Sequence, residues 1–166
     1  GQSELAQILL KNAATLGIDL NAEDSDGWTA FMSACAVGHA DVAKVLIENS
    51  TTSNIDLNAK DFEGRTAFMF ACLRGNADVA KVLMENSTTS SIDLNAKDND
   101  GRTAFIYACI WGKTSIVELM LDKADALQLD LTAKSNAGRT GFQWAQSERR
   151  TAVVNLIKAK RPSIAV

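Results

Sequence analysis

The side chains that usually catalyse reactions or bind metals are few in this chain. His39 is the only histidine, so a histidine pair and a multi-histidine zinc site are excluded, and a structural role between two helices is favoured. The three cysteines, Cys35, Cys72 and Cys109, lack the C-x-x-C spacing typical of zinc and redox sites. We therefore expect no catalytic residues and no metal site, and we predict that the chain is not an enzyme.

Two acidic tetrapeptides resemble the middle of a calcium-binding loop. Residues 24–27 read DSDG and residues 98–101 read DNDG. In a calcium loop the first ligand would fall on Ala22 and Ala96, and the closing glutamate would fall on Ser33 and Tyr107, so essential ligands are missing. We interpret both stretches as tight turns. The sequence also lacks a phosphate-binding loop and a dinucleotide fingerprint, so we expect no cofactor.

The cysteines favour a reducing compartment. They are spaced 37 residues apart, which suggests equivalent positions in three repeated units. In a solenoid, equivalent positions of neighbouring units lie about 10 Å apart, which exceeds the roughly 7 Å that a disulfide allows between two Cα atoms. We expect three small buried side chains carrying free thiols. No signal peptide is visible, so the sequence favours an intracellular, cytoplasmic protein.

Charge and hydropathy narrow the range of partners. The net charge of −3 gives no reason to expect binding to nucleic acid or to an anionic membrane. No apolar run reaches the roughly 20 residues that a membrane span needs. We therefore expect a monomer with neither a nucleic-acid nor a membrane partner.

A repeat of 37 residues organises the chain, since Gly27, Gly64, Gly101 and Gly138 follow one another at that spacing. Such a period is typical of a solenoid. We expect a single domain over residues 1–166, made of a partial repeat, three full repeats, a capping repeat and a fraying tail: 1–26, 27–63, 64–100, 101–137, 138–161 and 162–166. We favour a cut from a longer chain as the origin of the partial repeat, with a degenerate cap as the alternative.

Each unit is predicted to contain a turn and two antiparallel helices. In the unit 64–100, Thr66 should cap a first helix over residues 67–74, and Gly75 should end it in the left-handed conformation. A second helix should open at residues 76–78 and end at residues 85–86. The apolar stripes in this helix and in residues 5–9 should each form one helical face. Four phenylalanines that repeat unchanged are predicted to be core: Phe31, Phe68, Phe105 and Phe142.

The motif GRTAFMFACLRGNADVAKVLMEN, with its closing IDLNAKD, resembles the ankyrin repeat over nearly the whole chain. The resemblance implies an all-α solenoid of helix-turn-helix units with short hairpin-like loops. The unit is longer than the 33-residue ankyrin repeat. Positions 32, 69, 106 and 143 lack the family's histidine, which helps to join repeats by hydrogen bonds. We therefore expect apolar packing to join the repeats here.

Differences between repeats point to a binding surface. Units 27–63 and 64–100 differ at nine positions, seven of which lie in the turn, the first helix or its cap. The resemblance implies that these parts line a concave groove, and aromatic and arginine residues anchor protein interfaces. The predicted protein-binding residues are Trp28, Phe62, Arg65, Phe70, Leu73, Arg74, Arg102, Tyr107, Ile110, Trp111, Arg139 and Trp144.

The leading interpretation is a non-enzymatic module that binds a protein or peptide in this groove, with Tyr107, Ile110 and Trp111 as its apolar centre. Phe70 and Tyr107 have an alternative role in packing between repeats. Other interpretations stay open for the whole chain. They are a structural spacer or fragment of a longer ankyrin array without its own ligand, a designed or selected ankyrin binder, and a small-molecule or nucleotide site that uses Trp28, Phe62 and arginines for stacking.

Overall fold

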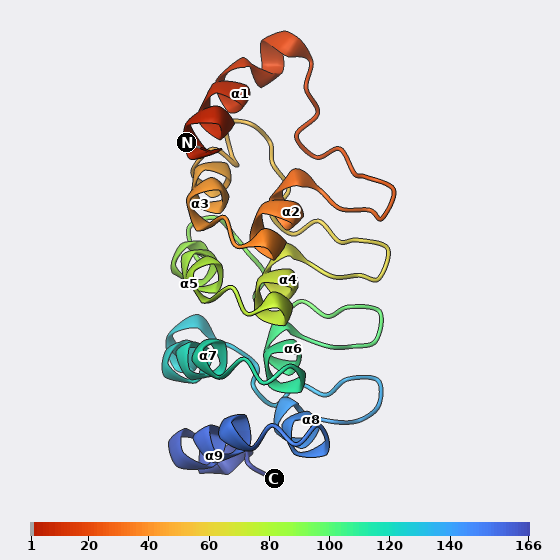
Figure 1. Cartoon of the computed structure of the whole chain (residues 1–166), viewed down its shortest axis with the longest axis vertical. Helices are drawn as coiled ribbons and strands as arrows, with labels where there is room; N and C mark the ends of the chain where they lie inside the picture. The colour runs from red at the N-terminus through yellow and green to blue at the C-terminus, as the bar shows by residue number, and fades with distance from the viewer. Residues whose placement is uncertain (1) are drawn as a thin grey trace.

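The computed structural model describes residues 2–166, and Gly1, which opens the partial repeat 1–26, lies outside them. Within this range the chain forms nine α-helices and one short 3-10 helix. The helices stand in two parallel stacks, with the turn loops projecting to one side and the termini at opposite ends (Figure 1). Their bounds are α1 Gln2–Leu16, α2 Ala30–Val37, α3 Ala40–Glu48, α4 Ala67–Arg74, α5 Ala77–Asn86, α6 Ala104–Ile110, α7 Thr114–Leu127, α8 Gly141–Ser147, α9 Thr151–Lys160 and η1 Pro162–Ile164.

The first helix of each unit starts at a threonine cap, as the sequence predicts. The Thr66 hydroxyl oxygen accepts a hydrogen bond from the Met69 backbone N–H at 3.4 Å, and Thr29, Thr103 and Thr140 cap their helices in the same way. Gly75 ends α4 with φ of 87°, a left-handed conformation that glycine adopts without a steric penalty. The predicted bounds of this helix are therefore confirmed.

Core side chains are buried both between the two stacks and between neighbouring helices of the same stack. The first helices α2, α4, α6 and α8 pack on one another in sequence, and α1, α3, α5, α7 and α9 form the second stack. The four repeated phenylalanines and the three cysteines are buried, as predicted. The free thiols are consistent with their expected role as small core side chains.

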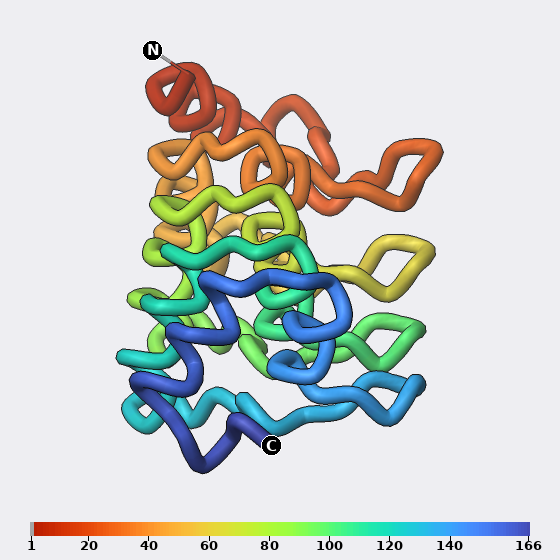
Figure 2. Tube along the Cα trace, turned by 60° about the horizontal axis from the view of Figure 1, so that its bottom comes forward, coloured from red at the N-terminus to blue at the C-terminus, as the bar shows by residue number. Residues whose placement is uncertain are grey.

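Hydrogen bonds as well as apolar contacts join the repeats, so the expectation of apolar packing alone is wrong. The Asn58 amide donates to the Ser91 carbonyl at 2.9 Å and accepts from the Asp93 N–H at 2.8 Å. Asn21 and Asn95 make the same pair of bonds to the following loop. An asparagine amide can donate and accept at once, so it satisfies backbone groups of the next loop. The loops consequently stack in register (Figure 2).

Helix α1 differs from the later second helices. Its predicted apolar face is largely exposed, with Leu5 at 58% and Ile8 at 60% of their full accessible area, whereas Leu10 and Ala13 are buried. In the unit 64–100, the position that corresponds to Leu9 is Leu83, which is fully buried. The difference arises because no first helix precedes α1 among the described residues, so part of its apolar face lacks a neighbour.

The C-terminal unit is tied to α7 by charge. Lys160 lies 2.7 Å from the Asp122 carboxylate and 3.1 Å from that of Glu118, and Arg161 donates to the Asp125 carboxylate at 2.8 Å. The fraying expected of residues 163–166 stays a prediction. Residues 162–164 form η1, and Ile164 packs against the core. Removing its apolar area from water contributes favourable free energy.

Candidate functional site

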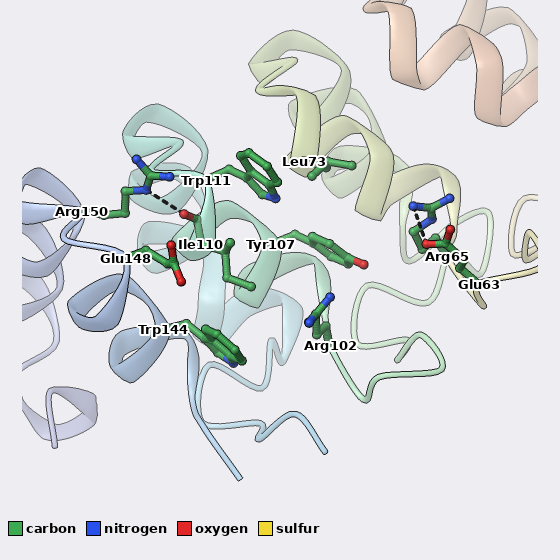
Figure 3. Close-up of a pocket in the computed structure, with 10 residues that line it drawn as sticks. All are labelled: Glu63, Arg65, Leu73, Arg102, Tyr107, Ile110, Trp111, Trp144, Glu148 and Arg150. Atoms are coloured by element: carbon green, nitrogen blue, oxygen red, sulfur yellow. Dashed lines mark hydrogen bonds and ion pairs between the residues drawn. The ribbon is translucent and has the colours of Figure 1, made fainter. Parts of the chain in front are cut away.

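A cavity of about 420 Å³ lies where α4, α6 and α8 meet the turn loops. We call it the groove pocket. Figure 3 shows its side chains, with Tyr107, Ile110 and Trp111 coming from α6 and its end. It contains seven of the twelve predicted binding residues. The lining residues are Glu63, Arg65, Leu73, Arg102, Tyr107, Ile110, Trp111, Trp144, Glu148 and Arg150.

The end of α6 positions the apolar part of the pocket. The spacing of Tyr107, Ile110 and Trp111 is i, i+3 and i+4, so the three side chains lie on the same face at the end of α6. The helix ends at Ile110, and Trp111 is its C-cap. Trp111 exposes 51% of its side chain. A half-exposed tryptophan at a cavity leaves a large apolar area available for contact.

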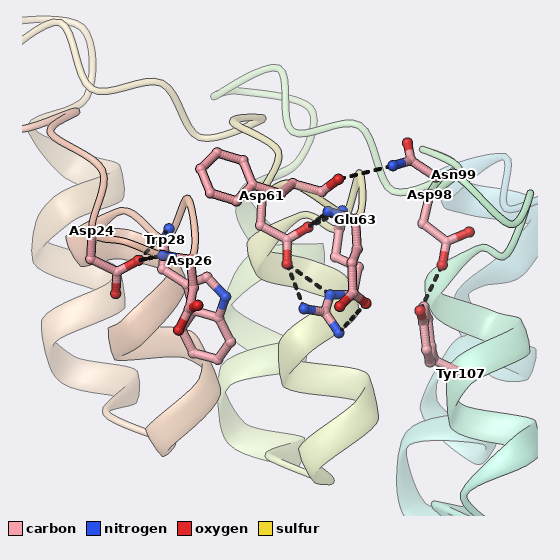
Figure 4. A network of polar contacts seen from close by, with 10 residues as sticks. Asp24, Asp26, Trp28, Asp61, Glu63, Asp98, Asn99 and Tyr107 are labelled. Carbon is pink, nitrogen blue, oxygen red and sulfur yellow. Dashed lines mark hydrogen bonds and ion pairs between the residues drawn. The ribbon is translucent and has the colours of Figure 1, made fainter.

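The turn loops place the charged side chains. In the turn before α4, the Oδ1 atom of Asp61 accepts the backbone N–H groups of Glu63 at 3.0 Å and Arg65 at 2.7 Å. Asp98 accepts the same two bonds in the next repeat, from Asp100 and Arg102. Figure 4 shows these turn carboxylates and their contacts. Asp24 Oδ1 likewise accepts the backbone N–H groups of Asp26 and Trp28, both at 2.9 Å, so both acidic tetrapeptides form turns, as predicted.

Arg65 is fully engaged within its own turn. Its Nε donates to Asp61 Oδ2 at 2.8 Å, and its Nη2 lies 2.7 Å from the same oxygen. Its Nη1 lies 2.7 Å from the Glu63 carboxylate, and its guanidinium lies 4.9 Å from the centre of the Phe70 ring. Little of its charge is left for a partner.

Arg102 occupies the corresponding position one repeat later but is bonded differently. The Tyr107 hydroxyl donates to Asp98 Oδ2 at 2.6 Å, so a tyrosine takes the oxygen that an arginine holds in the previous repeat. Arg102 pairs with Asp100 at 3.0 Å, while its buried Nε has no hydrogen-bond partner. Burial, together with the hydrogen bond to Asp98, raises the pKa of Tyr107, which keeps the hydroxyl protonated as a donor.

Trp144 forms one wall of the pocket. Its indole Nε1 donates to the Ser135 hydroxyl oxygen at 3.1 Å. The guanidinium carbons of Arg139 and Arg102 lie 4.9 Å and 5.7 Å from its ring centre. Cations over an aromatic face hold the ring in place. Arg139 is exposed and contacts the wall without lining the pocket.

Phe70 and Tyr107 follow the packing alternative. Phe70 exposes only 1% of its area, and its ring centre lies 4.2 Å from that of Trp28. Tyr107 exposes 6% of its area, although it lines the pocket. Large side chains at these positions fill the space between neighbouring first helices. Phe70 therefore offers almost no surface for direct contact with a partner.

Besides Phe70 and Arg139, three more predicted residues lie outside the groove pocket. Trp28 and Phe62 line a separate cavity of about 320 Å³ with Asp26, Asp61, Glu63 and Arg65. Phe62 exposes 69% of its area at a turn tip. Arg74 is exposed at the end of α4. The structure thus divides the predicted surface into two cavities and an isolated arginine.

Glu63, Glu148 and Arg150 line the groove pocket but were not predicted. Arg150 donates from Nε to the Ile110 carbonyl at 2.7 Å, which fixes the end of α6. Asn76, at the corresponding position two repeats earlier, bonds the carbonyls of Cys35 and Ala36. Extending the repeat comparison to this position in the last unit would have identified Arg150.

Residues 2–166 contain no group of three or more histidine, cysteine or acidic side chains arranged to hold a metal ion. Burial raises the pKa of all three cysteine thiols, so none is an activated nucleophile. Among the described residues, none of the helices combines the length and apolar character needed to cross a bilayer. The groove pocket itself combines the exposed apolar surface of Trp111 with charged side chains.

Comparison with known families gives one match. A family model described as ankyrin repeats (3 copies) matches residues 1–98 and, a second time, residues 89–165. Together these matches span almost the whole chain. No curated protein sequence matches it.

Proposed function

Because the chain belongs to the ankyrin-repeat family, whose domains generally act as protein–protein interaction modules and are typically non-enzymatic, we propose that it binds a protein or peptide in the groove pocket. The binding segment lies across α4, α6 and α8 and contacts the turn loops at its edge. The chain catalyses no reaction on this partner.

One observation carries the proposal: Trp111 is half exposed at the mouth of a cavity. Ile110 and Leu73, both partly buried, flank it, so an apolar centre is surrounded by arginine and glutamate side chains. This arrangement of apolar centre and polar rim is typical of protein interfaces. Tryptophan is also prominent among the residues that dominate binding energy.

The test starts from peptides that bind the purified chain, selected from a random 12-residue phage-displayed library. Their dissociation constants are then measured on Trp111→Ala and on Val37→Ala, a matched control, because Val37 is the exposed residue at the corresponding position two repeats earlier. Trp111→Ala is expected to weaken binding by about 2 kcal/mol or more, or roughly 30-fold. Val37→Ala should bind as the unchanged chain does.

Circular dichroism separates binding from folding in this test. The Trp111→Ala variant should keep its helical signal, since the side chain lies largely outside the core. Equal affinity of the two variants for every selected peptide would contradict the proposal and favour a structural spacer.

A further inference from the structure

The groove pocket holds an arginine whose donors are not satisfied within the chain. Resting on the binding role proposed above, we infer that the partner segment is acidic: a peptide carboxylate side chain binds Arg102, and an adjacent apolar side chain contacts Trp111. Tyr107 makes this possible because its hydroxyl bonds the Asp98 carboxylate oxygen that Arg102 would otherwise bond.

The chain itself supplies the comparison that supports this inference. Arg65 and Arg102 are separated by one repeat and follow equivalent turns. Arg65 directs Nε and Nη2 to Asp61 Oδ2 and Nη1 to Glu63. Arg102 has one ion pair, with Asp100, and a buried Nε without an acceptor. The Arg102 side chain also exposes 31% of its area, compared with 20% for Arg65, so its guanidinium is open to a ligand carboxylate although Nε itself is buried.

The cause of the difference is a single hydroxyl group. Phe70 stands where Tyr107 stands one repeat later, and a phenyl ring cannot bond Asp61. The Tyr107 hydroxyl lies 2.6 Å from Asp98 Oδ2, so that oxygen is already taken. Arg102 consequently turns towards Asp100 and lies over the Trp144 ring, where it lines the groove pocket.

Charges around the pocket favour a carboxylate over a cation at this point. The lining contains three arginines, Arg65, Arg102 and Arg150, and only two glutamates. One of these, Glu63, is paired with Arg65 at 2.7 Å. Glu148 also lines the pocket and opposes an anion, so orientation matters: the carboxylate is expected beside Arg102, away from Glu148. Guanidinium groups bind carboxylates through paired hydrogen bonds, which suits the fork that Arg102 presents.

Two capped tripeptides test the inference: acetyl-Leu-Glu-Leu-amide and acetyl-Leu-Gln-Leu-amide. They are titrated into nitrogen-15-labelled protein, and the indole N–H signals of Trp111 and Trp144 are followed, with Trp28 as a reference outside the pocket. The glutamate peptide should shift both signals and bind at least about tenfold more tightly than the glutamine peptide. Equal binding of the two peptides, or no shift with either, would overturn the inference.

Substitutions then assign the preference to its source. Arg102→Gln should abolish the preference for glutamate, whereas Arg74→Gln, which removes the same charge from an exposed site outside the pocket, should retain it. Tyr107→Phe should reduce the preference by about threefold or more, because Arg102 can then pair with Asp98 as Arg65 pairs with Asp61. An unchanged preference in Arg102→Gln or in Tyr107→Phe would overturn the assignment.

The library peptides distinguish this inference from the binding role on which it rests. Selected peptides that depend on Trp111 but contain no acidic residue would preserve the proposed function and refute carboxylate recognition. If no selected peptide depends on Trp111, both are wrong. Acidic residues recurring in Trp111-dependent peptides, with loss of binding in Arg102→Gln, would support both.

Discussion

Tyr107 and Phe70 differ by one oxygen atom, and that atom redirects the arginine beside it. In the turn before α4, Arg65 bonds the Asp61 carboxylate. In the turn before α6, Tyr107 bonds the corresponding Asp98 carboxylate, and Arg102 lines the groove pocket. The sequence placed all four residues among the candidate binding residues, with packing between repeats as the alternative for Phe70 and Tyr107. It could not separate the engaged arginine from the available one, because that depends on which donor reaches a particular carboxylate oxygen.

The buried cysteines provide a prediction about pH at the residue scale. Burial raises the pKa of Cys35, Cys72 and Cys109, so above about pH 8.5 the unfolded chain loses thiol protons that the folded chain keeps. Stability should therefore be unaffected below that pH and fall above it, by about 1.4 kcal/mol per thiol at pH 9.5.

Urea denaturation at pH 7.5 and pH 9.5 measures this fall, and Cys72→Ala should make it smaller by one thiol's share. An identical fall in that variant would show that other groups cause it. In the same pH range the native thiols should react with a disulfide reagent only as fast as the protein opens.

At the scale of the helix, the first helices were predicted well because their ends are encoded locally. A threonine cap and a left-handed glycine suffice to place both ends of α4. Trp111 shows the limit of such signals: α6 ends at Ile110, so that Trp111, one position before the glycine, forms its C-cap. Arg150, which bonds the Ile110 carbonyl from another repeat, has no local signal in α6 itself.

Removal of a threonine cap should cost measurable stability. Thr66→Ala removes the acceptor of the Met69 N–H group and should lower the free energy of unfolding by about 1 kcal/mol. Thr66→Ser keeps the hydroxyl and should recover most of the loss. Chemical denaturation of both variants measures the difference. Equal destabilisation by alanine and serine would mean that the methyl group, and not the cap, matters here.

The loop asparagines yield a second prediction at this scale. Asn95→Ala removes the bonds to the Gln128 carbonyl at 2.9 Å and from the Asp130 N–H at 2.8 Å. Both groups are exposed and can bond water instead, so the expected loss is about 1 kcal/mol.

Asn12→Ala is the matched control, since its amide bonds only the Ile8 carbonyl within α1. Its loss of stability should be clearly smaller than that of Asn95→Ala in the same denaturation experiment. If the two variants lose equal stability, the Asn95 bonds between repeats stabilise the protein no more than the Asn12 bond within a helix.

For the whole molecule, the 37-residue period predicted a solenoid and the resemblance to the ankyrin repeat predicted its paired helices, because each unit packs mainly on its neighbours. Features that depend on what lies beside an element could not be predicted this way. The apolar stripe of α1 has the same pattern as the stripe of α5, yet Leu5 and Ile8 are exposed because no first helix among residues 2–166 adjoins them. Likewise, the predicted surface contains two cavities, and Glu63 and Arg65 line both of them.

The most direct measurement locates a bound peptide on this stack. The tightest peptide from the random library is added to nitrogen-15-labelled protein, and the indole signals of Trp28, Trp111 and Trp144 are compared. Binding in the groove pocket predicts that the Trp111 and Trp144 signals shift at saturation while that of Trp28 stays in place. Shifts confined to Trp28, or no shift of Trp111, would contradict the account.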